Sequence, residues 1–185
     1  MFNIFGFYKF KKLNNLKKLK NRLENNLKDY EIRGTIIISP EGVNGTISDK
    51  KNNILKFNKL LKKILSIKKF NSENNSNSKF NPFHKLKIKI KKEVVPMGFK
   101  VRNYNFPKNN LNPREWNKII KKKDTVLIDA RKSFEYDVGT FKKSLNPNIE
   151  NFREFPKYLN QFKNSENIAM FCTGGIRCEK ANIYL

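Results

Sequence analysis

The sequence predicts an α/β protein with two domains, the first in β-α-β-β-α-β order and the second built on a parallel sheet. One observation is a change of pattern: apolar strands and two regular helices precede residue 95, and short buried strands separated by helical segments follow residue 113. A second is length, because 185 residues suffice for two small domains. A third is composition, since 38% hydrophobic residues with 16 Phe indicate a globular chain. We therefore expect domains at 1–95 and 113–185, joined by a linker at 96–112.

The elements of the first domain follow from apolar spacing. Residues 3–10 are a strand rich in Phe and Tyr, and leucines at helical spacing predict a helix over 12–29. Strands at 34–38 and 46–48 flank the turn-rich segment 39–45, and a second helix carries Ile54, Phe57, Leu60, Leu61, Ile64 and Leu65 on its apolar face. We expect an Asn/Ser-rich loop at 71–79 and a last strand at 86–91. This order is one element set of the ferredoxin-like fold.

The last strand of this domain alternates apolar and basic residues, which is typical of a half-exposed strand. Its outward lysines are Lys85, Lys87, Lys89 and Lys91. On an open sheet face such lysines can contact phosphates while nearby aromatic rings stack on bases. Lysine is equally a common protection of an edge strand against unwanted pairing. The sequence leaves both interpretations open.

The second domain begins with a predicted helix at 113–122 around Trp116. A buried strand at 125–129 ends in Asp-Ala-Arg, residues 152–162 are expected to be helical, and a strand at 167–171 leads into Cys172. Asp129 and Arg131 stand at the end of the first of these strands, and Glu135 and Gly139 follow. We interpret them as structural residues that brace the connection.

The net charge of +24 has two explanations. It can be an electrostatic footprint for a polyanion, most naturally a nucleic acid. It can also reflect compositional drift, because Lys and Asn together make up about a third of the chain, as A+T-rich coding would produce. Residues 1–100 hold 24 Lys/Arg against 7 Asp/Glu, a net of +17, so the first domain would supply most of the field.

Cysteine usage points to a reducing compartment, and we expect a cytoplasmic protein. Two cysteines six positions apart make no disulfide framework, and with the lone His84 far away in sequence they make a poor zinc pattern. We therefore expect no metal site. The apolar segment 1–8 is too short to cross a membrane, and its lysines follow the apolar run, which is the wrong order for a signal peptide, so we expect a first β-strand there.

The strongest chemical signal is the segment that starts at Cys172. The loop residues Thr173, Gly174, Gly175 and Ile176 lead to Arg177 and a helix-like segment, so backbone N–H groups, a helix N-terminus and a guanidinium can all stabilise a thiolate or its persulfide. We therefore predict that Cys172 is a reactive cysteine.

Loop length and neighbours restrict this chemistry. Cysteine phosphatases use a Cys-x5-Arg loop, whereas the spacing here is Cys-x4-Arg, which suits a sulfur carried on cysteine better than a tetrahedral phosphate. With His84 as its only histidine, in the other domain, the chain is a poor candidate for a Cys–His hydrolase. Cys178 either packs inside the first helical turn, which we favour, or acts as a resolving thiol.

Several segments together resemble the rhodanese-like tRNA uridine hydroxylase family. Those of the first domain are Phe7-Tyr-Lys-Phe10, Gly34-Thr-Ile-Ile-Ile-Ser-Pro-Glu-Gly-Val-Asn-Gly-Thr46 and Lys87-Ile-Lys-Ile-Lys-Lys-Glu-Val-Val-Pro-Met-Gly98. Those of the second are Asp129-Ala-Arg-Lys-Ser-Phe-Glu-Tyr-Asp-Val-Gly-Thr-Phe141, Asn151-Phe-Arg-Glu-Phe-Pro156 and Cys172-Thr-Gly-Gly-Ile-Arg-Cys-Glu-Lys-Ala181. The last is close to a signature of this family.

The resemblance implies an oxidoreductase that converts the wobble uridine of certain tRNAs to 5-hydroxyuridine. It implies molecular oxygen and an electron donor of unknown identity as co-reactants, tRNA as the partner, and Cys172 at the rhodanese active position, where a persulfide can form. A rhodanese-like domain normally continues past the active-loop helix, so we expect the second domain to be incomplete at its C-terminus. The alternatives are a persulfide sulfurtransferase and an RNA-binding protein with a relic rhodanese half.

Overall fold

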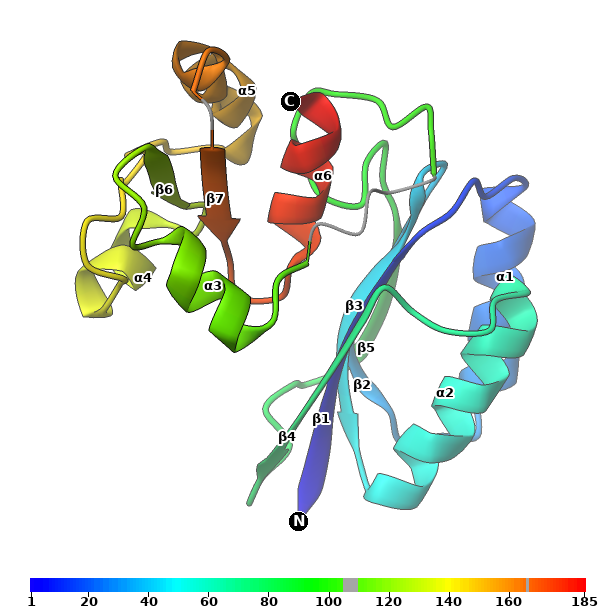
Figure 1. The fold of residues 1–185 in the computed structure, drawn as a ribbon. Helices are drawn as coiled ribbons and strands as arrows, with labels where there is room; N and C mark the ends of the chain where they lie inside the picture. Colours follow the sequence, from blue (N-terminus) through cyan, green and yellow to red (C-terminus); the bar gives the residue numbers. More distant parts are fainter. Residues whose placement is uncertain (105–109, 166) are drawn as a thin grey trace. The chain divides into compact units, whose positions relative to one another are not determined.

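The computed structural model describes residues 1–104, 110–165 and 167–185, and within them the chain forms two compact units, Met1–Val95 and Pro96–Leu185 (Figure 1). Part of the expected linker 96–112 falls outside the described residues, namely 105–109. Met97, which lies in the same segment, is 1% exposed and packs in the core of the second unit. No helix within the described ranges is both long and apolar enough to cross a membrane.

The first unit is a five-stranded sheet covered on one face by two helices (Figure 1). Its elements in chain order are β1 (Phe2–Phe10), α1 (Leu16–Leu27), β2 (Arg33–Ser39), β3 (Gly42–Asp49), α2 (Lys51–Leu65), β4 (Ser72–Ser78) and β5 (Leu86–Ile90). The strands lie in the order β4-β1-β3-β2-β5, and all neighbours are antiparallel except β2 and β5. Alternate apolar side chains of the strands and one stripe of each helix form the core, which includes Phe5, Phe7, Leu23, Ile36, Ile47, Phe57 and Leu61.

The expectation of a loop at 71–79 is wrong, because Ser72–Ser78 forms strand β4. It pairs antiparallel with β1, from Phe2 opposite Ser78 to Tyr8 opposite Ser72. The strand lies at the sheet edge and its side chains are largely exposed. It is held by backbone hydrogen bonds to β1, so its sequence lacks the alternation of apolar and polar residues that marks a half-buried strand. As a result, β4 supplies the last strand of the β-α-β-β-α-β order, and β5 is an additional strand at the opposite edge.

The segment between β2 and β3 forms a tight hairpin in which Ser39 pairs with Gly42. Gly42 has a φ of +146°, and a side chain there would collide with the backbone carbonyl of Lys9. Glu41 beside it is buried, and its Oε1 accepts a hydrogen bond of 2.9 Å from the Val94 N–H. The hairpin therefore fixes the end of β1 and the chain that follows β5.

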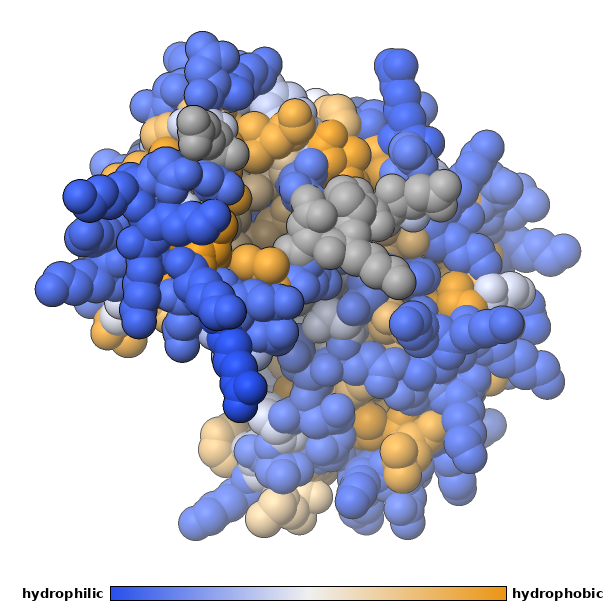
Figure 2. Space-filling model, viewed as in Figure 1, coloured by the Kyte–Doolittle hydropathy of each residue, from blue (hydrophilic) through white to orange (hydrophobic). Residues whose placement is uncertain are grey.

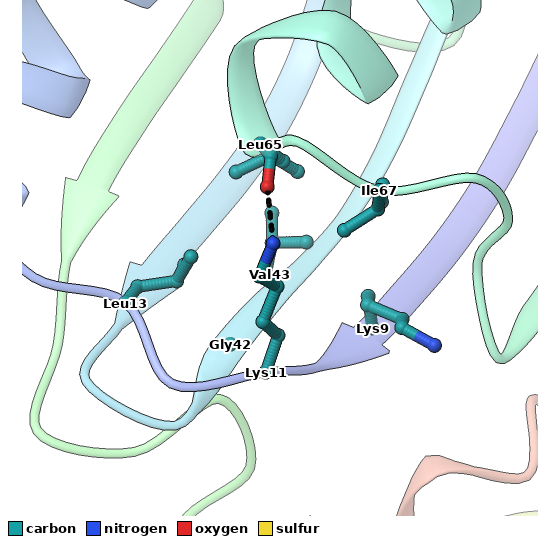
Figure 3. A pocket seen from close by; sticks show the side chains of 7 residues that line it. All are labelled: Lys9, Lys11, Leu13, Gly42, Val43, Leu65 and Ile67. Atoms are coloured by element: carbon teal, nitrogen blue, oxygen red, sulfur yellow. Dashed lines mark hydrogen bonds between the residues drawn. The ribbon is translucent and has the colours of Figure 1, made fainter.

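Helix α2 ends against the chain that leaves β1. Ser66 adopts a left-handed conformation at the helix end. The Lys11 Nζ donates to the Leu65 carbonyl at 2.9 Å (Figure 3). It also donates to the Ser66 carbonyl at 2.7 Å. Carbonyls in the last turn of a helix have no partner within it and carry partial negative charge. The ammonium satisfies them beside a small apolar depression lined by Leu13, Val43 and Ile67.

The second unit contains a two-stranded parallel sheet, formed by β6 (Thr125–Asp129) and β7 (Asn167–Phe171). Its helices are α3 (Pro113–Ile119), α4 (Ser133–Val138), α5 (Phe155–Leu159) and α6 (Ile176–Tyr184), with 3₁₀ turns at Phe152–Glu154 and Asn160–Phe162. The helical expectation for 152–162 is thus met as a 3₁₀–α–3₁₀ run. Its core packs Ile128, Phe155, Leu159 and Ala181 around one face of the strands.

Candidate active site

Strand β7 delivers Cys172 to the end of the parallel sheet. The side chains of Ile168 and Met170 pack against the core of the unit, which fixes the strand up to Phe171. Four residues then form a loop, 172–175, before α6 begins at Ile176. Cys172 is half-buried and both cysteines are free thiols.

The loop directs backbone N–H groups at the Cys172 sulfur. The Gly175 N–H donates to Sγ over 3.1 Å, and the N–H groups of Gly174, Arg177 and Cys178 also form hydrogen bonds with the sulfur. Gly175 has a φ of +86°, a left-handed conformation that a residue with a side chain adopts only with strain. The glycine therefore allows the chain to curl around the thiol before it enters the helix.

The Cys178 thiol is the strongest influence on Cys172. Its S–H donates a hydrogen bond to the Cys172 sulfur, and together with the backbone donors it outweighs burial and lowers the pKa of Cys172 to about 5. The same contact, with burial, raises the pKa of Cys178 well above its usual value. Cys172 is therefore a thiolate at neutral pH, and Cys178 is its protonated hydrogen-bond donor.

The Arg177 guanidinium has a different place from the one expected. Its Nη1 donates to the Ala130 carbonyl over 3.1 Å and lies 3.8 Å from the Glu135 carboxylate. The part of Arg177 that bonds the Cys172 sulfur is its backbone N–H. The guanidinium instead ties the first turn of α6 to the chain that follows β6.

Asp129, the last residue of β6, braces the connection together with Arg131 and Gly139, as predicted for these three residues. Arg131 Nε and Nη2 contact the two Asp129 carboxylate oxygens at 2.7–3.1 Å, and Nη2 also donates to the Gly139 carbonyl over 2.6 Å. Thr140 Oγ1 adds a bond of 2.9 Å to Asp129, which is 1% exposed. This fully bonded carboxylate fixes the loop between β6 and α4.

Glu135 is the residue whose place sequence reasoning missed. Its Oε1 accepts a hydrogen bond of 2.8 Å from Thr173 Oγ1, so it contacts the cysteine loop rather than only its own segment. The one sequence signal was its position in the first turn of α4, where a glutamate normally contacts the backbone at the helix start. Within the ranges the structure describes, His, Cys, Asp and Glu side chains form no group of three or more suited to a metal ion.

Comparison with known proteins identifies relatives over most of the chain. The family model for the UPF0176 acylphosphatase like domain matches residues 2–94. This match and the sheet order confirm the predicted ferredoxin-like first domain and the α/β class.

Curated relatives extend the similarity through the second unit. The tRNA uridine(34) hydroxylase of Pelagibacter ubique is 60% identical over 185 residues, which are all of this chain and 62% of that protein. The protein of the same name from Legionella pneumophila (strain Corby) is 39% identical over 98% of this chain and 73% of its own length. The one from Prochlorococcus marinus is 41% identical over 99% of this chain and 61% of its own length. The chain thus spans about three fifths to three quarters of the length of these relatives.

Proposed function

We propose that this chain, which belongs to the tRNA uridine(34) hydroxylase family, takes part in the hydroxylation of the wobble uridine of tRNA with Cys172 as its reactive group. The observation that carries the assignment to this residue is the cradle of N–H and S–H donors around the Cys172 sulfur. Such a cradle keeps a nucleophilic thiolate available at neutral pH.

The reaction converts the C5–H of uridine into C5–OH. One atom of molecular oxygen enters the base and the other leaves as water, so two electrons and two protons must come from an external reductant. The protein's contribution in this proposal is to hold tRNA and to present a charged sulfur beside the base. The same sulfur could also carry a persulfide, because the donors that stabilise a thiolate also stabilise a terminal sulfur anion.

The proposed partner, tRNA, matches the charge of the first unit. Lys87 and Lys89 on β5 are exposed at the sheet edge, while Ile88 between them is buried in the core. Hydrophilic side chains cover most of the face of the molecule seen in Figure 2. Lysines on one side of an edge strand form a row of cations that can follow a phosphate backbone.

The proposal is tested by nucleoside analysis. A strain lacking its own tRNA uridine hydroxylases is complemented with this chain, with its Cys172→Ser variant, or with the Legionella relative, and bulk tRNA is digested and read by mass spectrometry. Restoration of 5-hydroxyuridine-derived nucleosides by the wild-type chain and not by the Cys172→Ser variant is the expected result. Absence of these nucleosides with this chain, when the Legionella relative restores them, would contradict the proposal for this chain.

A persulfide sulfurtransferase is the second candidate, and the lowered pKa of Cys172 favours it equally. Thiosulfate:cyanide turnover by the purified chain, without any change in tRNA nucleosides, would support this activity instead. In a third outcome, the chain has neither hydroxylation nor sulfurtransferase activity, and its Cys172→Ser variant binds RNA as well as the wild type. This would support an RNA-binding function alone.

A further inference from the structure

The Glu135 carboxylate contacts the chain on both sides of the glycine pair that follows Cys172, in the loop and in the first turn of α6. Its Oε1 accepts the Thr173 hydroxyl at 2.8 Å, and its Oε2 lies 3.8 Å from Nη1 of Arg177. Thr173 precedes the glycine pair of the loop and Arg177 follows it. One side chain from a different segment therefore spans Gly174 and Gly175, two of the residues whose N–H groups are donors to the sulfur.

The carboxylate is itself held in place on α4. Glu135 lies in the first turn of that helix, and its Oε2 accepts a hydrogen bond of 3.3 Å from the Lys132 N–H at the helix start. The side chain is 21% exposed, so water screens its contacts only in part. Glu135 thus offers a fixed pair of oxygens to the loop rather than a freely rotating group.

The loop needs such an external contact because glycine makes it flexible. A side chain at Gly174 would meet no atom within 4 Å, so no neighbouring group packs against that side of the residue. A glycine loses more backbone entropy on ordering than an alanine does. The Gly175 N–H nevertheless lies 3.1 Å from the Cys172 sulfur, which requires a single loop conformation.

We propose that Glu135 is a positioning residue that holds the Cys172 loop at Thr173 and the first turn of α6 at Arg177, so that the backbone N–H groups between them remain directed at the sulfur. This inference rests on the proposed role of Cys172 as the reactive group. It assigns to Glu135 an action through Thr173 and Arg177, without contact with the substrate.

Charge and position act in opposite directions at this site, which makes the inference testable. As a negative charge near the sulfur, Glu135 disfavours the thiolate, so removing its charge alone would lower the pKa of Cys172 or leave it unchanged. As a positioning residue it favours the thiolate, because it holds the N–H donors in place. Removing its hold on the loop would therefore raise the pKa of Cys172.

The experiment follows the thiolate absorbance of the full chain against pH, in a Cys178→Ser background so that only Cys172 titrates. Glu135→Ala removes both contacts, Thr173→Val removes only the hydroxyl of an exposed residue, and Glu135→Gln keeps an acceptor for Thr173. We expect the midpoint to rise by about one pH unit or more in Glu135→Ala and Thr173→Val. In Glu135→Gln it should stay at the background value or fall.

The matched control is Glu115→Ala, because Glu115 makes the same helix-start contact on α3, at 2.8 Å from the Asn112 N, without contacting the loop. It should leave the midpoint unchanged. An unchanged midpoint in Thr173→Val would overturn the inference, and so would an equal rise in Glu135→Gln and Glu135→Ala. The experiment measures the pH midpoint of Cys172 ionisation and not the formation of a tRNA product. It therefore tests the role of Glu135 even if the nucleoside analysis contradicts the hydroxylation proposal.

Discussion

The reactivity of Cys172 should show an unusual dependence on pH. With a pKa of about 5, the thiol is almost fully ionised at about pH 6, whereas an ordinary cysteine with a pKa of about 8.5 is then about 0.3% thiolate. The thiolate of a more acidic thiol is also a weaker nucleophile, and a Brønsted slope of about 0.4–0.5 over this difference lowers its intrinsic rate about 40-fold. The net result is an alkylation rate about 7-fold above that of a free thiol at about pH 6.

The two rates should then cross near neutral pH. The Cys172 rate is already at its plateau there, while a free cysteine gains thiolate up to about pH 8.5 and overtakes it. The assay is iodoacetamide labelling read by peptide mass spectrometry, with a synthetic peptide of residues 170–180 as the free-thiol reference. Because the thiolate is favoured only in the folded loop, its contribution to stability is present above the pKa of an unfolded cysteine and is lost as the pH falls toward about 5.

Mutation of Cys178 tests how much its S–H donor contributes to the lowered pKa of Cys172. Cys178→Ala removes the S–H donor and should move the midpoint of the Cys172 profile upward by about one unit, whereas Cys178→Ser keeps a donor and should move it less. A wild-type midpoint near that of the free peptide would refute the reasoning, as would equal labelling of the two cysteines at every pH.

Three further outcomes follow from the fold and the charge. Gly42→Ala should destabilise the first unit by about 3 kcal/mol or more in urea unfolding, because the added methyl group would collide with the Lys9 backbone carbonyl. A destabilisation below about 1 kcal/mol would contradict the close approach of the Gly42 and Lys9 backbones. Asp129→Asn should cost about 3 kcal/mol by leaving Arg131 without its charged partner. Burial acts to raise the pKa of Asp129, but hydrogen bonds from Arg131 and Thr140 outweigh it and lower the pKa. The stability that the ionised carboxylate contributes is therefore present above the pKa of an unfolded aspartate and is lost as the pH falls below it. An acid-unfolding midpoint that is equal in the wild type and in Asp129→Asn would contradict this. Replacing Lys87 and Lys89 by Gln should reduce the slope of log affinity for tRNA against log salt by about 0.7–0.9 for each phosphate that the lysines no longer neutralise, and an unchanged slope would return these lysines to edge protection.

A helix or strand could be predicted from the sequence where it buries one face, because burial imposes a regular spacing of apolar residues. Helices α1 and α2 and strands β2 and β3 place apolar residues in the core, so their spacing is visible in the sequence. Strand β4 buries none of its side chains, and its Asn and Ser residues are typical of loops. Only the pairing with β1, a contact across more than sixty residues, makes it a strand.

The same distinction applies to the site. The backbone donors to the Cys172 sulfur lie within the short segment from Gly174 to Cys178, so a local motif was sufficient to predict them, whereas the Cys178 thiol was expected to pack in the first helical turn and not to donate to the sulfur. Glu135 is close to the loop only because β6 and β7 are parallel neighbours, and nothing within its own segment indicates Thr173 as its partner. The direction of the Arg177 side chain was missed for the same reason, because its acceptor, the Ala130 carbonyl, lies just after the other strand.

The polar composition of β4 has a consequence for how this sequence can change. Most side chains of β4 are exposed, although Glu73 pairs with Lys62 at 2.6 Å. The strand is held mainly by main-chain pairing, so most of its positions accept a residue that tolerates an extended conformation and has an N–H. A run as polar as Ser-Glu-Asn-Asn-Ser-Asn-Ser is therefore compatible with a place in an ordered sheet. Saturation mutagenesis would therefore find β4 the most permissive strand of the first unit, with proline as the main exception.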